Sequence, residues 1–203
     1  YGHSIRVYMT PNITDIIIGG ADKLHLFDTP LYLCRNNGLA PDQRMLKRAM
    51  DLLISIPAVL LLSPLMLGIA LAIKIEDGGP VFFRQKRLTR GGREFLICKF
   101  RSMRVNAEED GVARLATRHD DRITRVGSFL RRTRLDELPQ LLNVIRGEMS
   151  IIGPRPERPE IARQYEETMP EFNYRLRVKA GLTGYAQILG KYNTIPHDKL
   201  KLD

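Results

Sequence analysis

The most conspicuous feature of the hydropathy pattern is an uncharged, apolar run from Leu52 to Ile73. At about 1.5 Å per residue, a straight helix of this length would reach roughly 33 Å, the thickness of the hydrocarbon core of a bilayer. A soluble domain could bury such a helix, but a run that is apolar on every side exceeds what a core of that kind needs. The pattern therefore predicts a membrane helix.

The interior of this run contains two points at which a helix would weaken. Pro64, near the middle, removes a backbone donor and frees the carbonyl of Leu60, and the hydroxyl of Ser63 can partly satisfy a freed carbonyl. Pro57 adds a second weak point. Both flanks of the run are basic, so the positive-inside rule selects no direction of crossing. On the residues alone, a re-entrant helix and a kinked spanning helix remain equally open.

A β-hairpin is predicted after the apolar run. The segments GGPVFFRQKR and REFLICKFRSM are rich in β-branched and aromatic residues, and a glycine turn, TRGG at residues 89–92, joins them. The stretch 104–121 that follows is polar and charged, which is typical of a surface helix or loop. Before the run, residues 1–40 are predicted to form short strands and turns, with SIRVYM and residues 15–18 as strand segments.

Helical periodicity dominates the second half of the chain. Residues 124–130 are predicted to begin one helix, and a second is predicted to start near Leu135. The second helix has one apolar face, with the spacing i, i+3, i+4 and i+7, formed by Leu138, Leu141, Leu142 and Ile145. Pro139 is tolerable only in its first turn, and Gly147 suits its end. Asp136 and Glu137 would then lie at a helix N-terminus.

Two further signals lie near the end of the chain. A charged helix is predicted over residues 159–167. Beyond it, Gly181, Gly184 and Gly190 suggest a loop in which backbone segments approach closely, because glycine has no side chain to keep them apart.

Composition adds the strong positive charge to this picture. The chain of 203 residues has a net charge of +9 and a pI near 9.8, which suits nucleic acid, anionic lipid or a phosphorylated substrate. Cys34 and Cys98 lie far apart without metal-ligand spacing, so neither a disulfide framework nor a zinc site is expected. Because the chain begins at Tyr1 and ends in KLKLD without a stop signal, we expect it to be part of a longer protein.

Two adjacent carboxylates follow three arginines in RRTRLDELPQ, residues 131–140. Asp136 and Glu137 fit an ordinary helix start, in which acids interact favourably with the helix dipole and pair with surface arginines. The same surroundings keep a carboxylate ionised, and an ionised aspartate can attack phosphorus to form an aspartyl-phosphate. A neighbouring carboxylate can hold Mg²⁺, which prefers one or two carboxylates plus phosphate oxygens.

A second candidate motif is GPRPE, residues 153–157, in which prolines flank Arg155. The prolines fix the backbone on either side and would orient the guanidinium toward a phosphate at low entropic cost. A rigid turn with a solvated arginine fits the same motif equally well, so GPRPE decides nothing by itself.

In combination these motifs resemble the bacterial sugar transferase family, the monotopic polyprenyl-phosphate phosphoglycosyl transferases that begin capsule, exopolysaccharide or glycan assembly. Each motif is modest singly, but their order is highly specific. The resemblance runs from about Arg44 to the end of the chain and rests on KRAMD, the apolar run with SP, GGPVFFRQKR, FLICKFRSMR, RTRLDELPQLLNVIRGEMSIIGPRPE and KAGLTGYAQILGK. Residues 1–40 look like the linker and end of the extra domain of larger members.

The resemblance implies roles for individual residues. Asp136 matches the catalytic aspartate that attacks the β-phosphate side of a nucleotide diphosphate-sugar, and Glu137 matches its partner, which is associated with Mg²⁺. Three positions match basic residues near the site, with a role in binding substrate phosphate: Lys99, Arg131 and Arg155. Lys191 stands where many members have arginine, so it keeps the charge but loses the bidentate fork. Ala180 stands where many have proline.

The implied fold is α+β: a mainly helical cytosolic domain with a small β-hairpin or sheet, attached by an N-terminal re-entrant helix that breaks at Ser63 and Pro64. We expect a linker and domain tail at 1–43, the membrane helix at 44–77 and a catalytic domain at 78–203. The implied location is the bacterial inner (cytoplasmic) membrane, with the catalytic domain facing the cytosol. The chain stops before the amphipathic C-terminal helices that are usual in the family.

The implied function is transfer of a sugar-1-phosphate from a nucleotide diphosphate-sugar, with UDP-sugar the expected donor, to polyprenyl (undecaprenyl) phosphate. The expected route is a covalent aspartyl-phosphosugar intermediate, and direct transfer with Asp136 as base or metal ligand is the alternative. Expected partners are the nucleotide-sugar, polyprenyl phosphate and membrane lipid, without nucleic acid. A non-enzymatic alternative is a basic, membrane-attached binding protein for nucleic acid or anionic lipid, which the charge and RQKRLTRGGR would suit.

Overall fold

The computed structural model describes residues 7–9, 22–26, 29–34, 41–105 and 120–188. It divides the chain into two compact units, Tyr1–Pro41 and Asp42–Asp203. The first unit contains an antiparallel sheet in the order β1–β3–β2, formed by β1 (Val7–Met9), β2 (Asp22–Leu26) and β3 (Thr29–Cys34). The expected strands before the apolar run are thus confirmed in part, whereas residues 15–18 lie outside the described residues.

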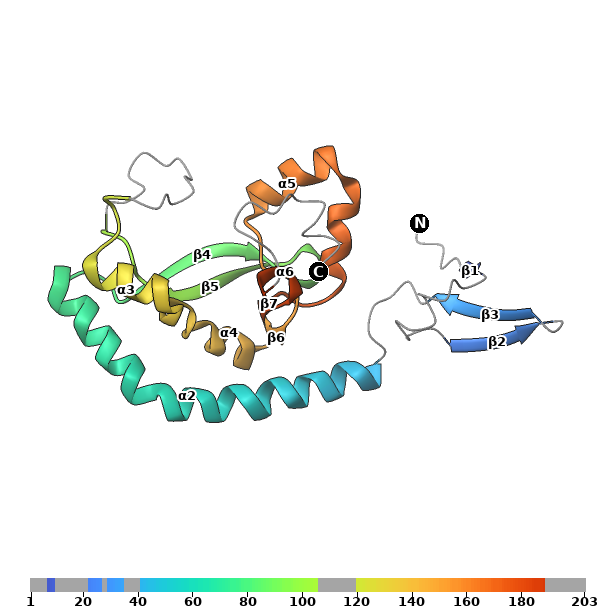
Figure 1. Cartoon of the computed structure of the whole chain (residues 1–203), viewed down its shortest axis with the longest axis horizontal. Helices are drawn as coiled ribbons and strands as arrows, with labels where there is room; N and C mark the ends of the chain where they lie inside the picture. Colours follow the sequence, from blue (N-terminus) through green and yellow to red (C-terminus); the bar gives the residue numbers. More distant parts are fainter. Residues whose placement is uncertain (1–6, 10–21, 27–28, 35–40, 106–119, 189–203) are drawn as a thin grey trace. The chain divides into compact units, whose positions relative to one another are not determined.

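The apolar run lies within α2 (Pro41–Asp77), which is one continuous helix. Figure 1 shows the helix curving through its middle, so the predicted break at Ser63 and Pro64 is a bend rather than an interruption. The hydroxyl of Ser63 donates to the carbonyl of Leu60 at 2.7 Å. This carbonyl is the one that Pro64 cannot bond, so the side chain replaces the missing backbone donor and the helix continues.

Both ends of α2 contact other elements of the second unit, to which the helix belongs, while its middle is exposed. Near the start, the carboxylate of Asp51 accepts from Ser150 Oγ at 2.9 Å and from Ile151 N at 3.0 Å. Arg48 donates to the last carbonyls of a short helix, α4, which is described below. Between the ends, Leu61 is 81% exposed. The most apolar window of α2 has a mean hydropathy of 2.4 with 11% of it buried, so by length and composition the helix could cross a membrane.

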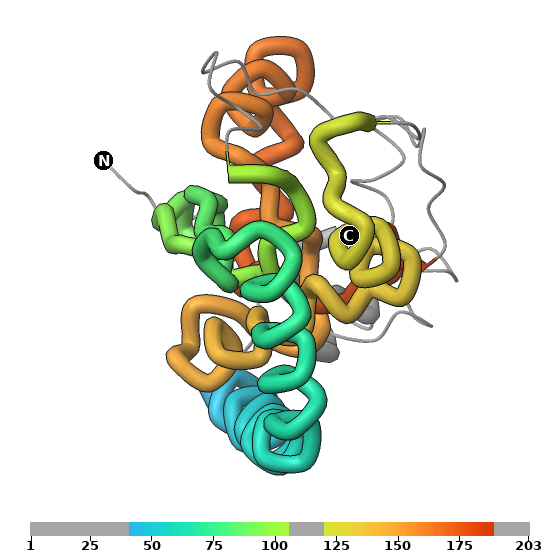
Figure 2. Tube along the Cα trace, turned by 90° about the vertical axis from the view of Figure 1, so that its left-hand side faces the viewer, coloured from blue at the N-terminus to red at the C-terminus, as the bar shows by residue number. Residues whose placement is uncertain are grey.

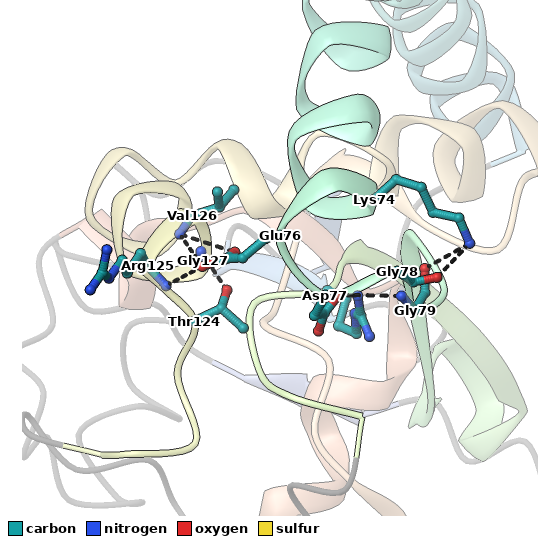
Figure 3. A network of polar contacts seen from close by, with 10 residues as sticks. Lys74, Glu76, Asp77, Gly78, Gly79, Thr124, Arg125, Val126 and Gly127 are labelled. Carbon is teal, nitrogen blue, oxygen red and sulfur yellow. Dashed lines mark hydrogen bonds and ion pairs between the residues drawn. The ribbon is translucent and has the colours of Figure 1, made fainter.

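The C-terminal end of α2 is anchored to α3 (Arg125–Thr133), as Figure 3 shows. The carboxylate of Glu76 accepts from the backbone nitrogen of Arg125 at 2.8 Å, and Thr124 Oγ1 accepts from Gly127 N at 2.9 Å. These bonds satisfy donors in the first turn of α3 that no helical carbonyl can reach. The predicted helix at residues 124–130 is confirmed, with Thr124 as its N-cap.

The predicted hairpin is confirmed. β4 (Phe82–Leu88) and β5 (Glu94–Phe100) pair antiparallel, with Phe82 opposite Phe100 and Leu88 opposite Glu94. The turn between them is a short 3₁₀ helix, η1 (Arg90–Gly92). Gly91 and Gly92 both have φ near +70°, a left-handed conformation that glycine adopts without a steric penalty.

The segment after α3 differs from the sequence prediction. Instead of a helix from Leu135, the chain forms one 3₁₀ turn, η2 (Leu135–Glu137), and α4 (Gln140–Arg146) begins only afterwards. Arg134 ends α3 in the left-handed conformation with φ 61°, and Pro139 offers no backbone donor. Asp136 and Glu137 therefore do not lie in the first turn of an α-helix. The predicted end at Gly147 is correct, because this residue caps α4 with φ 85°.

A parallel pair of short strands, β6 (Ser150–Ile152) and β7 (Gly181–Thr183), was not predicted. A side chain on Gly181 would lie 2.1 Å from the nitrogen of Gly153, and one on Gly184 would lie 2.4 Å from the oxygen of Gly153. The predicted close approach of backbones is therefore confirmed at Gly181 and Gly184, whereas Gly190 lies outside the described residues. Between the strands run α5 (Pro159–Thr168), as predicted, and η3 (Pro170–Arg177), and α6 (Tyr185–Ile188) follows β7.

The core lies on the two faces of the hairpin. One cluster consists of Phe95, Ile97, Val144, Met149 and Ala180. The other ties the end of α2 to the hairpin and α3 and consists of Ile69, Ile73, Phe100 and Leu130. In Figures 1 and 2, α2 and α5 lie at opposite sides of this unit, with the hairpin and α4 between them. The protein is thus a mixture of helices and small sheets, as the predicted α+β class requires.

Candidate active site

The site forms where β5 passes the turn η2. Side chains alternate along a strand, so Lys99 shares one face of β5 with Phe95 and Ile97. That face meets η2, and Lys99 Nζ lies 2.7 Å from Glu137 Oε1. The side chains of this ion pair are only 19% and 16% exposed, so water screens the pair weakly.

The loop 153–157 brings a second cation to the same carboxylate. Arg155 Nη2 lies 3.8 Å from Glu137 Oε1, and the Arg155 side chain is 45% exposed. Lys99, Glu137 and Arg155 come from three segments that are distant in sequence, and the structure gathers them into one cluster. Each of the three was a candidate from sequence, but their contact was not predictable.

Opposing effects set the charge of this cluster. Burial alone would raise the pKa of Glu137, but the charge and hydrogen bond of Lys99, together with Arg155 and Arg134, hold that pKa below its usual range. Burial lowers the pKa of Lys99, and Glu137 acts against this effect. The net result is an ionised carboxylate between cations.

Asp136 has a different environment from its neighbour. It is 8% exposed, and its Oδ1 is buried without a hydrogen-bond partner among the residues that the structure describes. Burial raises its pKa, and the charges of Lys99 and Arg131 act in the opposite direction. The α-helical dipole expected from the sequence does not act on Asp136, because η2 is a single 3₁₀ turn, and the ionised state of this carboxyl group stays a prediction.

The remaining predicted phosphate-binding residues are Arg131 and Lys191. Arg131 lies in the last turn of α3, and its charge acts on Asp136. Lys191 lies outside the described residues. The structure thus brings Lys99, Glu137 and Arg155 into contact, places Arg131 near Asp136, and describes nothing of Lys191.

A pocket of ≈ 250 Å³ opens beside the cluster. Its lining includes Lys99, Glu137 and Arg155 together with residues that sequence reasoning did not single out: Arg87, Gln140 and Gln187. Arg87 stood only in a generally basic stretch, RQKR, and no spacing rule could separate it from its neighbours. Three cations now face one ion-paired carboxylate, so the pocket suits an anionic ligand with more than one negative charge.

Asn143 holds the parts of this site together. Its Oδ1 accepts from Cys98 N at 3.0 Å and its Nδ2 donates to Leu96 O at 2.8 Å, so α4 is bonded to the backbone of β5. The side chain is fully buried. This arrangement fixes β5, which carries Lys99, against the helix that follows Glu137.

The donor set is compatible with Mg²⁺. No group of three or more His, Cys, Asp or Glu side chains gathers anywhere in the described parts of the chain. Mg²⁺ needs only one or two carboxylates when substrate phosphates and water supply its other ligands. Asp136 and Glu137 provide adjacent hard oxygen donors, and Asp136 Oδ1 has no partner in the residues described, which leaves it available.

The chain is similar to known proteins over most of its length. Residues 42–203 match the profile of a family described as bacterial sugar transferase. The chain is 42% identical over 190 residues to a UDP-glucose:undecaprenyl-phosphate glucose-1-phosphate transferase of Xanthomonas campestris pv. campestris, covering 93% of this chain and 39% of the relative. It is 46% identical over 173 residues to a protein of the same description from Escherichia coli (strain K12), covering 85% and 35%.

A third relative differs in length. An exopolysaccharide production protein of Rhizobium leguminosarum bv. phaseoli is 45% identical over 150 residues, covering 72% of this chain and 74% of the relative. The chain spans less than half the length of the Xanthomonas and Escherichia relatives. With a family match over most of its residues and relatives at these identities, the chain belongs to the bacterial sugar transferase family.

Proposed function

We propose that this protein transfers a sugar-1-phosphate from a UDP-sugar to undecaprenyl phosphate, the first membrane step of a polysaccharide pathway. The observation that carries the proposal is the buried Oδ1 of Asp136, which has no partner in the described parts of the chain and lies beside the cluster of Lys99, Glu137 and Arg155. The relatives named for the same transfer support the proposal. The alternative of a basic binding protein for nucleic acid or anionic lipid has no support from the comparisons.

In the proposed mechanism, Asp136 acts as a nucleophile. Its carboxylate oxygen forms a bond to the sugar-bearing phosphorus while the bond from this phosphorus to the bridging oxygen breaks, and UMP leaves with the electron pair. The phosphate oxygen of undecaprenyl phosphate then attacks the same phosphorus, which forms the lipid diphosphate-sugar and frees the aspartate. Oδ1 of Asp136 has no hydrogen-bond partner among the described residues, which suits this role because no bond to that oxygen has to break before attack.

The cations would stabilise the diphosphate. Lys99 and Arg155 both reach one oxygen of Glu137 and line the pocket, so a diphosphate entering here meets their two positive charges. Bound Mg²⁺, held by Glu137 with Asp136 beside it, would neutralise phosphate charge and favour the departure of UMP. We expect EDTA to abolish UMP release and added Mg²⁺ to restore it.

We also propose that α2 re-enters the bacterial inner membrane on its cytosolic face. The support is that Asp51 and Glu76, near opposite ends of the helix, both accept hydrogen bonds from other elements of the second unit. Leu61 between them is exposed. A helix that spans the bilayer would place its ends on opposite sides, where one polar domain cannot contact both. This arrangement would hold the pocket at the membrane surface, where a soluble donor and a lipid acceptor can meet.

The covalent step is tested by intact-mass analysis of the full-length protein after incubation with UDP-sugars and Mg²⁺ but without lipid. We expect a phosphosugar adduct on the wild type that Asp136→Asn lacks, together with UMP release. An enzyme that turns over with undecaprenyl phosphate yet never shows the adduct would favour direct transfer. A screen of nucleotide-sugars, read by UMP release, would identify the sugar.

The topology is tested with single cysteines at Asp42 and Glu167, introduced into a protein without Cys34 and Cys98. Re-entry predicts that an impermeant thiol reagent labels both positions from the cytosolic side only. Labelling of the two positions from opposite sides would establish a spanning helix instead.

A further inference from the structure

The loop 153–157, which carries Arg155, is bonded at four consecutive backbone carbonyls. The four bonds join the oxygens of Pro154, Arg155, Pro156 and Glu157 to Gly181 N (2.8 Å), Arg175 Nη2 (2.8 Å), Arg87 Nη1 (3.1 Å) and Leu88 N (3.0 Å), respectively. The donors belong to β7, η3 and β4, so three separate elements hold the loop. Two of the four donors are arginine side chains rather than backbone groups.

Arg175 is itself held on several sides. It is 6% exposed, lies 3.6 Å from Glu157 in an ion pair, and stacks over the ring of Phe172 at 4.6 Å from its centre. A guanidinium with these neighbours has a single orientation, and in that orientation it donates to the carbonyl of Arg155.

Arg87 bonds the loop from β4. Its Nη1 donates to Pro156 and its Nη2 donates to Gln85 Oε1 at 2.8 Å. Burial lowers the pKa of Arg87 to about 10, so the group is still a cation at neutral pH. Its Nε is buried without a partner within the described ranges.

Burying two guanidinium groups costs desolvation free energy, which the ion pair of Arg175 with Glu157 and the bonds to the loop carbonyls offset. The loop that they hold has one outward-facing charged side chain at its centre, that of Arg155, which reaches toward Glu137 and lines the pocket. Prolines on both sides restrict the backbone of Arg155 further. The bonds from Arg87 and Arg175 to adjacent carbonyls therefore determine where the Arg155 guanidinium stands.

We propose that Arg87 and Arg175 are positioning residues that hold Arg155 against the diphosphate of the donor, an inference that rests on the proposed function. Neither needs to touch the reacting atoms. Replacing either by lysine keeps the positive charge but loses the planar fork and its reach. The loop would then relax, and a displacement of about 1 Å at a substrate-binding group costs roughly 10²-fold in rate.

The test is a pair of double-mutant cycles on the full-length protein, with kcat and KM measured from UMP release. We expect Arg175→Lys and Arg87→Lys each to lower kcat/KM by about 10- to 100-fold. If both act through Arg155, adding either change to Arg155→Ala causes little further loss. Losses that multiply in both cycles would overturn the proposal, because the arginines would then act independently of Arg155.

Two matched changes on the same elements serve as controls. Arg177 lies on η3 and stacks on Tyr174 at 4.3 Å, and Arg84 lies exposed on β4. In the described residues neither donates to a carbonyl of the loop. Arg177→Lys and Arg84→Lys should therefore change kcat/KM by less than about twofold, since surface substitutions are close to neutral.

Hydrogen exchange separates this inference from the proposed function. Amides in residues 151–158 should exchange faster in Arg175→Lys and Arg87→Lys than in the wild type. In the two controls, their exchange rates should equal those of the wild type. This readout needs no activity: if no UDP-sugar gives UMP with the wild type, the proposed function fails while the exchange data still judge the positioning. Unchanged exchange of these amides in both variants would overturn the positioning role of Arg87 and Arg175. If one variant does not fold, the other arginine carries the test.

Discussion

The two parts of the candidate site differ in how completely their polar groups are bonded. Arg134, immediately before the turn η2, has a left-handed backbone. Within η2, the buried Oδ1 of Asp136 has no partner among the described residues. In the loop 153–157, four consecutive carbonyls are bonded and the chain is restricted by two prolines. The comparison motivates a proposed division of labour, in which the Asp136 carboxylate reacts and the loop with four bonded carbonyls supplies the fixed charge of Arg155.

Removing the underbonded carboxylate should have the largest effect. We expect Asp136→Asn to lower UMP release by about 10⁴-fold or more, as losses of nucleophiles do. Its unfolding temperature should not fall, because a neutral side chain of the same shape replaces a carboxyl group that burial disfavours in its charged form. Steady-state kinetics and thermal unfolding measure the two outcomes. An active Asp136→Asn enzyme would remove the proposed nucleophile from the mechanism.

Removing the fixed charge should have the next largest effect. Arg155→Ala is expected to lower kcat/KM by about 10²- to 10³-fold, the range seen when one preorganised donor is lost. The loop itself should stay folded, because its backbone bonds do not involve the Arg155 side chain. Steady-state kinetics would measure the fall in kcat/KM, and circular dichroism would check that the variant is folded. Equal activity of Arg155→Ala and wild type would mean that the rigid loop serves only the fold.

Crowding the backbone at Gly153, at the start of the loop, should lower the stability of the protein. A side chain on Gly153 would lie 2.4 Å from the backbone oxygen of Lys179, so Gly153→Ala should destabilise the protein by about 1–3 kcal/mol. Gly68→Ala in α2 is the control, because open space surrounds that position. Chemical denaturation compares the two, and a harmless Gly153→Ala would contradict the close packing of β6 and β7.

Relieving the strained turn should have the smallest effect. Arg134→Gly replaces a left-handed arginine by a residue that adopts this conformation freely, so we expect a gain of about 0.5 kcal/mol in the free energy of unfolding. Arg132→Gly, two residues earlier and within α3, should instead lose about 0.5–1 kcal/mol. The opposite signs in denaturant titrations test the strain; two losses of equal size would refute it.

Local signals in the sequence predicted much of the fold. The hairpin, the helix beginning in residues 124–130 and the stop at Gly147 follow from nearby residues and were correct. The strand pair β6–β7 was missed because each strand has three residues, too few for a period, and their pairing joins distant segments. The helix start near Leu135 was misplaced because the apolar spacing begins only at Leu138 and does not show whether the preceding turn is α-helical or 3₁₀.

The residues of the candidate site also differ in whether the sequence alone identified them. Asp136, Glu137 and Arg155 were recognisable from their motifs, and their roles stay predictions. Arg87 and Arg175 were not, because arginines are frequent in this basic chain and only burial distinguishes these two from the exposed ones. The metal, the sugar and the membrane topology stay proposals until the experiments above are done.

The sequence by itself determined which segments are apolar, where the chain turns, and which carboxylates and arginines are candidates for phosphate chemistry, because these depend on neighbouring residues. Only the tertiary structure decided that Lys99 and Arg155 meet on one oxygen of Glu137 and that burial raises the pKa of Asp136. The reason is physical: burial and ion pairing depend on contacts between segments far apart along the chain, and no local pattern encodes those distances.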